Sequence, residues 1–333
     1  MLKYILKRLL YVLPTLFVIS ILVFITIQLP PGDYVTNMLE NMRNQTTGGV
    51  TWTPEFEAAM RERYGLNEPV TVQYLKWIGN IVLHADFGYS FQYSEPAVDM
   101  IRDRIGMTLV VSFASFIFTW VVALPIGVLS AVRQYSLADY IFSFIGFIGL
   151  ATPSFLIALV LMFLAFKYGN VSLSGLFSPE FEHAPWSIER VIDLFKHLWI
   201  PMIIIGVGGT AGLIRTMRAN LLDELHKPYV ETARAKGLPE WRLLIKYPLR
   251  HAMNPFVSGM AWVLPSLVAG EAIVSIVLNL PTTGPILLEA LRQQDMFLAA
   301  GFLMLLSLLT IVGMLLSDIL LAWLDPRIRY EAK

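Results

Sequence analysis

The chain has 333 residues, of which 56% are hydrophobic and only 15% are charged. A soluble protein normally carries more charge on its surface, so the composition indicates an integral membrane protein. Because the chain has no cysteine, it can form no disulfide, no thiolate metal site and no cysteine nucleophile. Its formal net charge of zero does not suggest the strongly basic surface of a nucleic-acid-binding protein.

The N-terminal apolar segment, residues 9–29, follows three basic residues. At about 1.5 Å per residue it is roughly 31 Å long, enough to cross a bilayer. A cleaved signal peptide is the alternative, but its apolar region is shorter and ends at a small-residue cleavage site, whereas this segment ends in Pro-Pro-Gly. Five further segments are long enough to span: residues 107–132, 140–166, 198–214, 256–280 and 297–324.

Six spans place both termini on one side of the membrane, and the charges indicate which side. Segments on the side of the termini hold 15 lysines and arginines against 7 acidic residues, whereas those on the opposite side hold 10 against 16. Because positive charge concentrates on the cytoplasmic side, both termini are predicted to be cytoplasmic.

The domain organisation follows from these spans. Residues 1–29 form the N-terminal segment and first span, 30–106 an extracytoplasmic lobe, 107–324 a core of five spans, and 325–333 a cytoplasmic tail. The lobe is too long for a simple connector. Within it, Thr53 and Pro54 predict a helix start and Gly65 its end, and residues 94–105 predict a helix lying on the lobe or the membrane surface before the second span.

A search for catalytic chemistry finds no convergent site. There is no G-x-x-x-x-G-K-[ST] phosphate loop, and the five histidines lack metal-ligand spacing. The sequence GVGGTA at 206–211 matches a loose dinucleotide fingerprint, but it lies inside an apolar span with no preceding strand, so its glycines predict close helix packing instead. The carboxylates within spans, Glu271 and Asp318, lie on different helices. No catalytic residue and no metal ligand is predicted.

The 41-residue loop 215–255 contains the segment YVETARAKGLPEW, residues 229–241. Pro228 can start a short helix, Gly237 can adopt the left-handed conformation that ends it, and Pro239 can start a second helix. On that second helix, basic residues recur every four positions at Arg242, Lys246 and Arg250.

Small residues suggest that this segment enters a groove on another protein. Ala233 and Ala235 beside Gly237 would form a knob of little bulk, with Glu231, Arg234 and Lys236 at its rim. The alternative is a solvated cytoplasmic connector that carries positive charge.

The stretch YVETARAKGLPEWRLLIKYPLRHAMNP resembles the EAA loop of ABC importer permeases. Glu231, Ala233 and Gly237 match the glutamate, second alanine and glycine of that motif, and Thr232 replaces its first alanine. The chain is similar over nearly its whole length to the oligopeptide and dipeptide permease family, through RLLYVLPTLFVISILVF, RYGLNEPVTVQYLKW, DFGYS, ALPIGVLSA, ATPSFLIALVLM and LDPRIRY.

This resemblance implies an all-α type I importer fold of the MetI-like class, with six transmembrane helices, in the inner membrane of a bacterium or archaeon. It implies a second homologous permease in a heterodimer, two cytoplasmic ATPase subunits that hold the ATP and Mg²⁺, and an extracytoplasmic substrate-binding protein. This chain itself would bind no cofactor. The implied ATPase-coupling positions are Glu231, Ala233, Arg234, Gly237 and Leu238. A secondary carrier without ATPase subunits is the rival, but no internal hydropathy repeat supports it.

The sequence departs from the family pattern near the fifth span. Where the family has a glutamate, a phenylalanine and a P-G-x-G turn, this chain has Ser275, Leu278 and PTTG at 281–284. Glu271 lies one turn before Ser275 on the same face, and the pair is predicted to face the pathway or the dimer partner and not lipid. For Glu271 itself a structural hydrogen-bonding role is predicted, with a role in the substrate pathway as the alternative.

Asp318 in the last span is predicted to be structural and to pair with Arg215 or Arg218.

The cargo is the least determined feature of the sequence. The family takes up oligopeptides, dipeptides, nickel and, in some branches, short oligosaccharides. The altered turn at 281–284 favours oligosaccharides, although no contact residue can be assigned.

Overall fold

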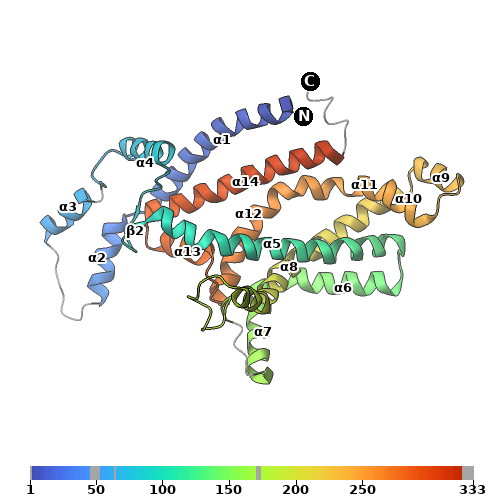
Figure 1. The fold of residues 1–333 in the computed structure, drawn as a ribbon. Helices are drawn as coiled ribbons and strands as arrows, with labels where there is room; N and C mark the ends of the chain where they lie inside the picture. Colours follow the sequence, from blue (N-terminus) through green and yellow to red (C-terminus); the bar gives the residue numbers. More distant parts are fainter. Residues whose placement is uncertain (1, 46–52, 64, 170–173, 325–333) are drawn as a thin grey trace. The chain divides into compact units, whose positions relative to one another are not determined.

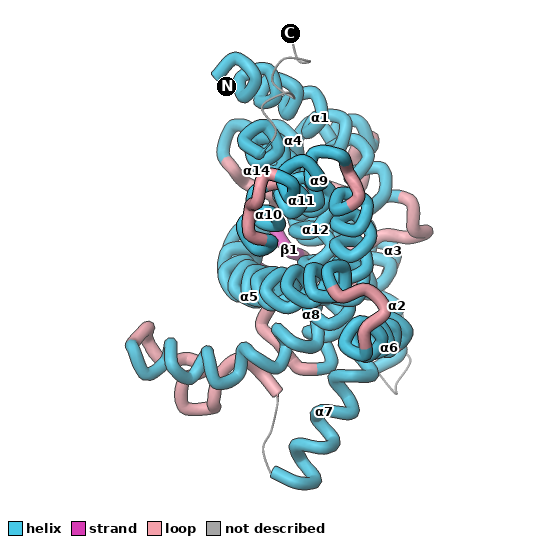
Figure 2. The backbone as a smooth tube through the Cα atoms, turned by 90° about the vertical axis from the view of Figure 1, so that its right-hand side faces the viewer, coloured by secondary structure: helices cyan, strands magenta, loops and turns pink. Residues whose placement is uncertain are grey.

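The computed structural model describes residues 2–45, 53–63, 65–169 and 174–324, and within them the side chains except those of 2–8, 40–45, 169, 260–271 and 321–324. The described chain is helical apart from loops and one short antiparallel hairpin, which pairs Tyr89 with Pro96 and Ser90 with Glu95 (Figures 1 and 2). The strands are β1 (Tyr89–Ser90) and β2 (Glu95–Pro96). The helices are α1 (Leu2–Gln28), α2 (Tyr34–Gln45), α3 (Pro54–Arg63), α4 (Val70–His84), α5 (Ala97–Val132), α6 (Leu137–Ala151), α7 (Ser154–Gly169), α8 (Ile188–Leu225), α9 (Pro228–Ala235), α10 (Glu240–Lys246), α11 (Pro248–Ala252), α12 (Asn254–Val277), α13 (Thr283–Arg292) and α14 (Met296–Leu324).

The chain divides into two compact units. One unit comprises residues 1–6, 107–281 and 310–333, and it includes the 215–255 loop. The other comprises residues 7–106 and 282–309, and it includes the predicted lobe.

Four helical stretches among the described residues are long and apolar enough to cross a membrane: Leu9–Gln28, Ala97–Val132, Ile188–Leu225 and Met296–Leu320. A fifth span is formed if the bent pair Leu137–Ala151 and Ser154–Tyr168 counts as one. The remaining predicted span, 256–280, falls in α12, whose side chains are not described between 260 and 271. The described residues therefore support a multi-span membrane protein, and six spans stay a prediction.

The segment 140–166, which is predicted to be long enough to span, is not one continuous helix. α6 and α7 are separate helices that bend by 98° at their junction, and Figure 1 shows α7 turning away from α6. Thr152 has extended backbone angles, φ −94° and ψ 121°. The following Pro153 disfavours helical angles at the residue before it and has no N–H to continue the helix, so the break is built into this dipeptide.

Residues 97–105, in the stretch predicted to form a helix before the second span, are helical, but they are the first turns of α5, which runs unbroken for 36 residues from Ala97 to Val132. The prediction for 53–65 is confirmed. The Thr53 hydroxyl accepts a hydrogen bond from the Phe56 N–H (3.3 Å), α3 starts at Pro54, and Gly65 has a φ of +68°.

The unit that contains the lobe has its own core. Phe24, Trp77 and Phe302 are almost fully buried in it, and the Trp77 indole N–H donates to the Phe87 carbonyl oxygen (3.1 Å). At its edge, the carboxylate of Asp295 accepts a hydrogen bond from the Ser90 hydroxyl (2.6 Å), which ties the β1–β2 hairpin to the residue that precedes α14.

In the other unit, α5 and α8 approach closely at Gly206. A Cβ atom at this position would lie 2.5 Å from Cδ1 of Phe118, and the Thr119 hydroxyl donates to the Gly206 carbonyl oxygen (3.1 Å). Small residues allow helices to pack in lipid, where no hydrophobic effect draws them together. The prediction of close packing is confirmed at Gly206, and the dinucleotide fingerprint is a stretch of helix. At Gly208 and Gly212, by contrast, an added Cβ would meet nothing within 4 Å.

Candidate functional site

The 229–241 loop folds as helix, glycine turn and helix, as its sequence predicts. α9 begins with Pro228 at its first position, and Gly237 follows its end with a φ of +77°. The N–H groups of Gly237 and Leu238 donate to the carbonyl oxygens of Arg234 (3.0 Å) and Ala233 (3.4 Å). A left-handed glycine with backbone bonds of this kind is a common way to end a helix. After Pro239, α10 starts at Glu240.

The loop has a small core of its own, in which Val230, Ala233 and Leu243 are buried and Tyr229, Leu238 and Tyr247 are packed against them. The prediction that Ala233 forms part of an exposed knob is wrong, because its side chain is only 6% exposed. Val230 and Ala233 are three residues apart and so share one face of α9, which turns toward α10. Ala235, which lies off this face, is exposed.

The outer surface of the loop carries the charged residues Glu231, Arg234 and Lys236, all exposed beside Gly237. Arg234 makes a bidentate ion pair with Glu240, with Nε–Oε1 at 2.6 Å and Nη2–Oε2 at 3.3 Å. The hydrogen bonds from Arg234 lower the pKa of the Glu240 carboxyl. Glu231 has no hydrogen bond or ion pair with the described residues, so its carboxylate is available to a partner.

Two contacts fix the loop to the end of α8. The Tyr229 hydroxyl donates to the Glu224 carboxylate, and burial together with this bond raises the pKa of Tyr229. α11 and the start of α12 pack on α8, with Ala252 and Phe256 buried against Met217 and Leu221. The loop is therefore a folded extension of α8.

The prediction of one basic face through Arg242, Lys246 and Arg250 is wrong, because the helix ends before Arg250. Tyr247 has non-helical angles, φ −118° and ψ −82°, and Pro248 starts the separate helix α11. The residue before a proline is disfavoured in the helical region, which accounts for the break.

Asp139, a residue that sequence reasoning missed, pairs with Arg218. The guanidinium donates to both carboxylate oxygens at 2.9 Å, from Nε and from Nη2. The prediction that Asp318 pairs with Arg215 or Arg218 is wrong, since Arg218 is engaged by Asp139 and no ion pair joins Asp318 to either arginine. The Ser136-x-x-Asp139 spacing is a helix-start pattern and could have placed Asp139 in the first turn of a helix capped by Ser136, though not as the partner of Arg218.

The residues of the fifth predicted span are only partly visible. The side chain of Glu271 lies outside the described residues, so its role stays a prediction. Ser275 is fully buried inside the chain, which contradicts the prediction that it faces a pathway or a dimer partner in this structure. In the altered turn, Thr282, Thr283 and Gly284 are also buried.

The chain matches two family profiles that together cover most of its length. The profile described as "Binding-protein-dependent transport system inner membrane component" matches residues 123–330, and that of the corresponding N-terminal region matches residues 1–112. The chain belongs to this family of ABC transporter permeases, which are multi-pass inner-membrane proteins.

Among curated proteins, the chain is similar to named peptide permeases. It is 36% identical to the oligopeptide transport system permease protein AppB of Bacillus subtilis, over 99% of this chain and 100% of that protein. It is 30% identical to OppB, the oligopeptide permease of Haemophilus influenzae, and 30% identical to DppB, the dipeptide permease of Escherichia coli, each over 99% of this chain and 100% of the relative.

Proposed function

We propose that this chain forms half of the translocation pathway of an ATP-driven, binding-protein-dependent importer and that its 229–241 loop docks into an ATPase subunit. The observation that carries the proposal is the loop's construction. Its glycine turn is held by a buried core, it is fixed to α8, and it presents the unengaged carboxylate of Glu231. A solvated connector would need no core of its own.

The proposed partners follow from family membership. A second homologous permease would complete the pathway, two ATPase subunits would bind and hydrolyse ATP, and an extracytoplasmic protein would deliver the substrate. ATP and Mg²⁺ would be held by the ATPase subunits and not by this chain. Both termini and the loop are proposed to lie on the cytoplasmic side, in agreement with the charge distribution.

Short peptides are the proposed cargo. Support comes from the names of the three relatives, which are an oligopeptide permease, a second oligopeptide permease and a dipeptide permease. The prediction of an oligosaccharide cargo from the sequence depends on the turn at 281–284 alone. Titration of the partner binding protein with a peptide mixture and with short oligosaccharides distinguishes the two, and saturable binding of sugar without peptide would overturn the peptide proposal.

Gly237 provides the test of coupling. An added Cβ would meet nothing within 4 Å, so the cost of substitution comes from the backbone angle alone. A left-handed β-branched residue costs roughly 1–2 kcal/mol, whereas asparagine tolerates this region far better. We expect Gly237→Val to lower ATP-driven uptake and substrate-stimulated ATP hydrolysis by about tenfold, and Gly237→Asn to retain most of both activities.

Membrane insertion of both variants, measured as the amount of folded chain in purified membranes, is the control. If Gly237→Val inserts normally and its uptake and ATPase stimulation equal those of the unmodified protein, the loop does not couple this chain to an ATPase. A companion variant, Glu231→Gln, should weaken copurification of the ATPase subunits without changing the fold of the loop, because the exposed Glu231 side chain makes no hydrogen bond or ion pair with the described residues.

A further inference from the structure

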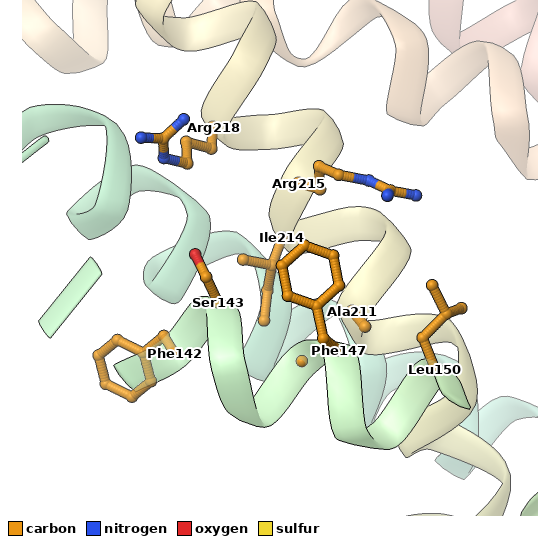
Figure 3. A pocket seen from close by; sticks show the side chains of 9 residues that line it. Phe142, Ser143, Phe147, Leu150, Ala211, Ile214, Arg215 and Arg218 are labelled. Atoms are coloured by element: carbon orange, nitrogen blue, oxygen red, sulfur yellow. The ribbon is translucent and has the colours of Figure 1, made fainter. Parts of the chain in front are cut away.

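A pocket of about 180 Å³ lies between α6 and α8 (Figure 3). Both helices belong to the same compact unit. The pocket is lined by Phe142, Ser143, Gly146, Phe147, Leu150, Ala211, Ile214, Arg215 and Arg218. Nothing in the proposed transport cycle uses it.

The two arginines at this pocket are in different electrostatic situations. Arg218 is neutralised by Asp139 through two hydrogen bonds of 2.9 Å. Arg215, three residues earlier on α8, is exposed and forms no ion pair or hydrogen bond with the described residues. Figure 3 shows the two side chains reaching in different directions from α8, with Ile214 and Phe147 between them. One full positive charge is therefore available at the pocket.

The remaining walls divide into a small polar part and a larger apolar part. Ser143 contributes a hydroxyl on α6, and Phe147 and Leu150 continue along the same helix as exposed apolar side chains. At Gly146 the two helices come close, since an added Cβ would lie 3.5 Å from the Ala211 Cβ. A ligand that fits this pocket has an anionic, hydrogen-bonding end and a long apolar part.

The depth of the pocket matches the edge of a membrane. Arg215 directly follows the apolar segment 198–214, and Ser143 is six residues from the start of α6, roughly 9 Å by helical rise. An arginine at this level reaches toward the phosphate groups of the nearest leaflet. On the proposed sidedness this is the cytoplasmic leaflet, where anionic lipids favour basic side chains.

We propose that the pocket binds one anionic phospholipid of the cytoplasmic leaflet. The lipid phosphate accepts charge-assisted hydrogen bonds from the Arg215 guanidinium, and an acyl chain lies along Phe147 and Leu150. The proposal depends on the proposed sidedness and not on ATPase docking.

Native mass spectrometry of the full chain, released from nanodiscs of mixed phosphatidylglycerol and phosphatidylcholine, tests it. We expect the unmodified protein to retain phosphatidylglycerol preferentially. Arg215→Gln should lower the apparent affinity for this lipid about tenfold, the loss expected for hydrogen bonds to a charged group. The matched control is Arg133→Gln, which removes the same charge from an exposed arginine outside the pocket and should change nothing.

A second variant keeps the charge and fills the space. Ser143→Leu should also reduce phosphatidylglycerol retention, because the larger side chain occupies the pocket.

Equal retention by Arg215→Gln and the unmodified chain would overturn the proposal, as would phosphatidylcholine binding with the same affinity. Loss of bound lipid on adding inorganic phosphate would identify a soluble anion site instead, and a carboxylate of a second permease seated on Arg215 in the purified complex would assign the arginine to a protein interface. Lipid retention is measured without ATPase subunits, so failure of the coupling proposal leaves this result unaffected.

Discussion

Asp139 and Arg218 show how one charged residue is accommodated next to apolar helices. The carboxylate is 4% exposed and the guanidinium 27%. A charge in this environment is costly unless a partner or water meets it, and here the geometry is bidentate. The ion pair itself adds little net stability compared with an apolar pair. Removal of one partner is nevertheless strongly destabilising, because it leaves the other charge without a partner.

Replacement of Arg218 by glutamine is expected to destabilise the chain by about 3 kcal/mol. The measurement is the free energy of unfolding of the detergent-solubilised protein in denaturant. The control is Lys76→Gln, which breaks the exposed Lys76–Glu68 pair, whose Nζ–Oε1 distance is 2.6 Å, and should cost less than about 1 kcal/mol. Equal losses in the two variants would show that the Asp139–Arg218 pair behaves as a surface ion pair.

The conformations of single residues were predicted correctly where neighbouring residues in the sequence decide them. Gly237 was predicted to be left-handed because a glycine at the C-terminus of a short helix commonly adopts this conformation, and its φ of +77° confirms the prediction. The partnership of Asp139 and Arg218 could not be predicted in this way, since 79 residues separate them and only the packing of α6 on α8 brings them together. The burial of the Ala233 side chain was not predicted for the same reason, because it depends on where α10 packs against α9.

At the scale of elements, the β1–β2 hairpin depends on one buried carboxylate. Asp295 is fully buried and accepts hydrogen bonds from the Ser90 hydroxyl (2.6 Å) and the Gln92 N–H (3.2 Å). Burial raises the pKa of Asp295, and the hydrogen bonds from Ser90 and Gln92 offset only part of that rise. The native state therefore holds the proton more tightly than the unfolded chain, in which the pKa of an aspartate is about 3.9.

The raised pKa of Asp295 predicts how the stability of the chain depends on pH. In the window between the unfolded pKa and the raised folded pKa, the native state binds more protons, so the contribution of Asp295 to stability grows as pH falls and is lost as pH rises. We compare the free energy of unfolding of the unmodified chain with that of Asp295→Asn. As pH is lowered from 7 toward 4, we expect the unmodified chain to become more stable relative to the variant. The asparagine keeps a carbonyl oxygen as acceptor for Ser90 but does not titrate. A difference that is constant with pH, or that shifts toward the variant, would contradict the raised pKa.

The positions at which helices end were predicted less well than the presence of the helices, and the prolines explain why. Pro153 and Pro248 each break a helix, yet Pro125 and Pro201 lie inside α5 and α8, which continue through them. A proline removes one backbone hydrogen bond, and neighbouring packing decides whether a helix survives that loss. Hydropathy over residues 140–166 is high on both sides of Pro153, so an apolar run alone could not reveal a 98° bend.

At the scale of the whole molecule, composition and family motifs identified the class, and the profile matches confirm it. The number of spans and their sidedness remain predictions, because charge counts are a statistical preference for one orientation. The division into two compact units could not be predicted, since each unit combines segments distant in sequence, such as residues 7–106 with 282–309.

The absence of cysteine makes the sidedness directly measurable. A single cysteine at Glu231 should react with a membrane-impermeant maleimide only in inside-out vesicles, and one at Glu55 on α3 should react only in intact spheroplasts. Both positions are exposed in the chain, so in membranes that lack the ATPase subunits their accessibility depends on the side of the membrane. Labelling of both cysteines from the same side would invalidate the assigned topology. The unmodified chain, which cannot react, is the background control.

α8 continues for 38 residues through Pro201, from its Ser187 cap to the base of the 229–241 loop. At about 1.5 Å per residue it is roughly 57 Å long, nearly twice the thickness of the hydrocarbon layer. Close to its middle, α8 packs tightly on α5, where Gly206 meets Phe118 and Thr119. If this contact acts as a pivot for a rigid α8, a displacement of one end of the helix would move the other end in the opposite direction by a similar distance.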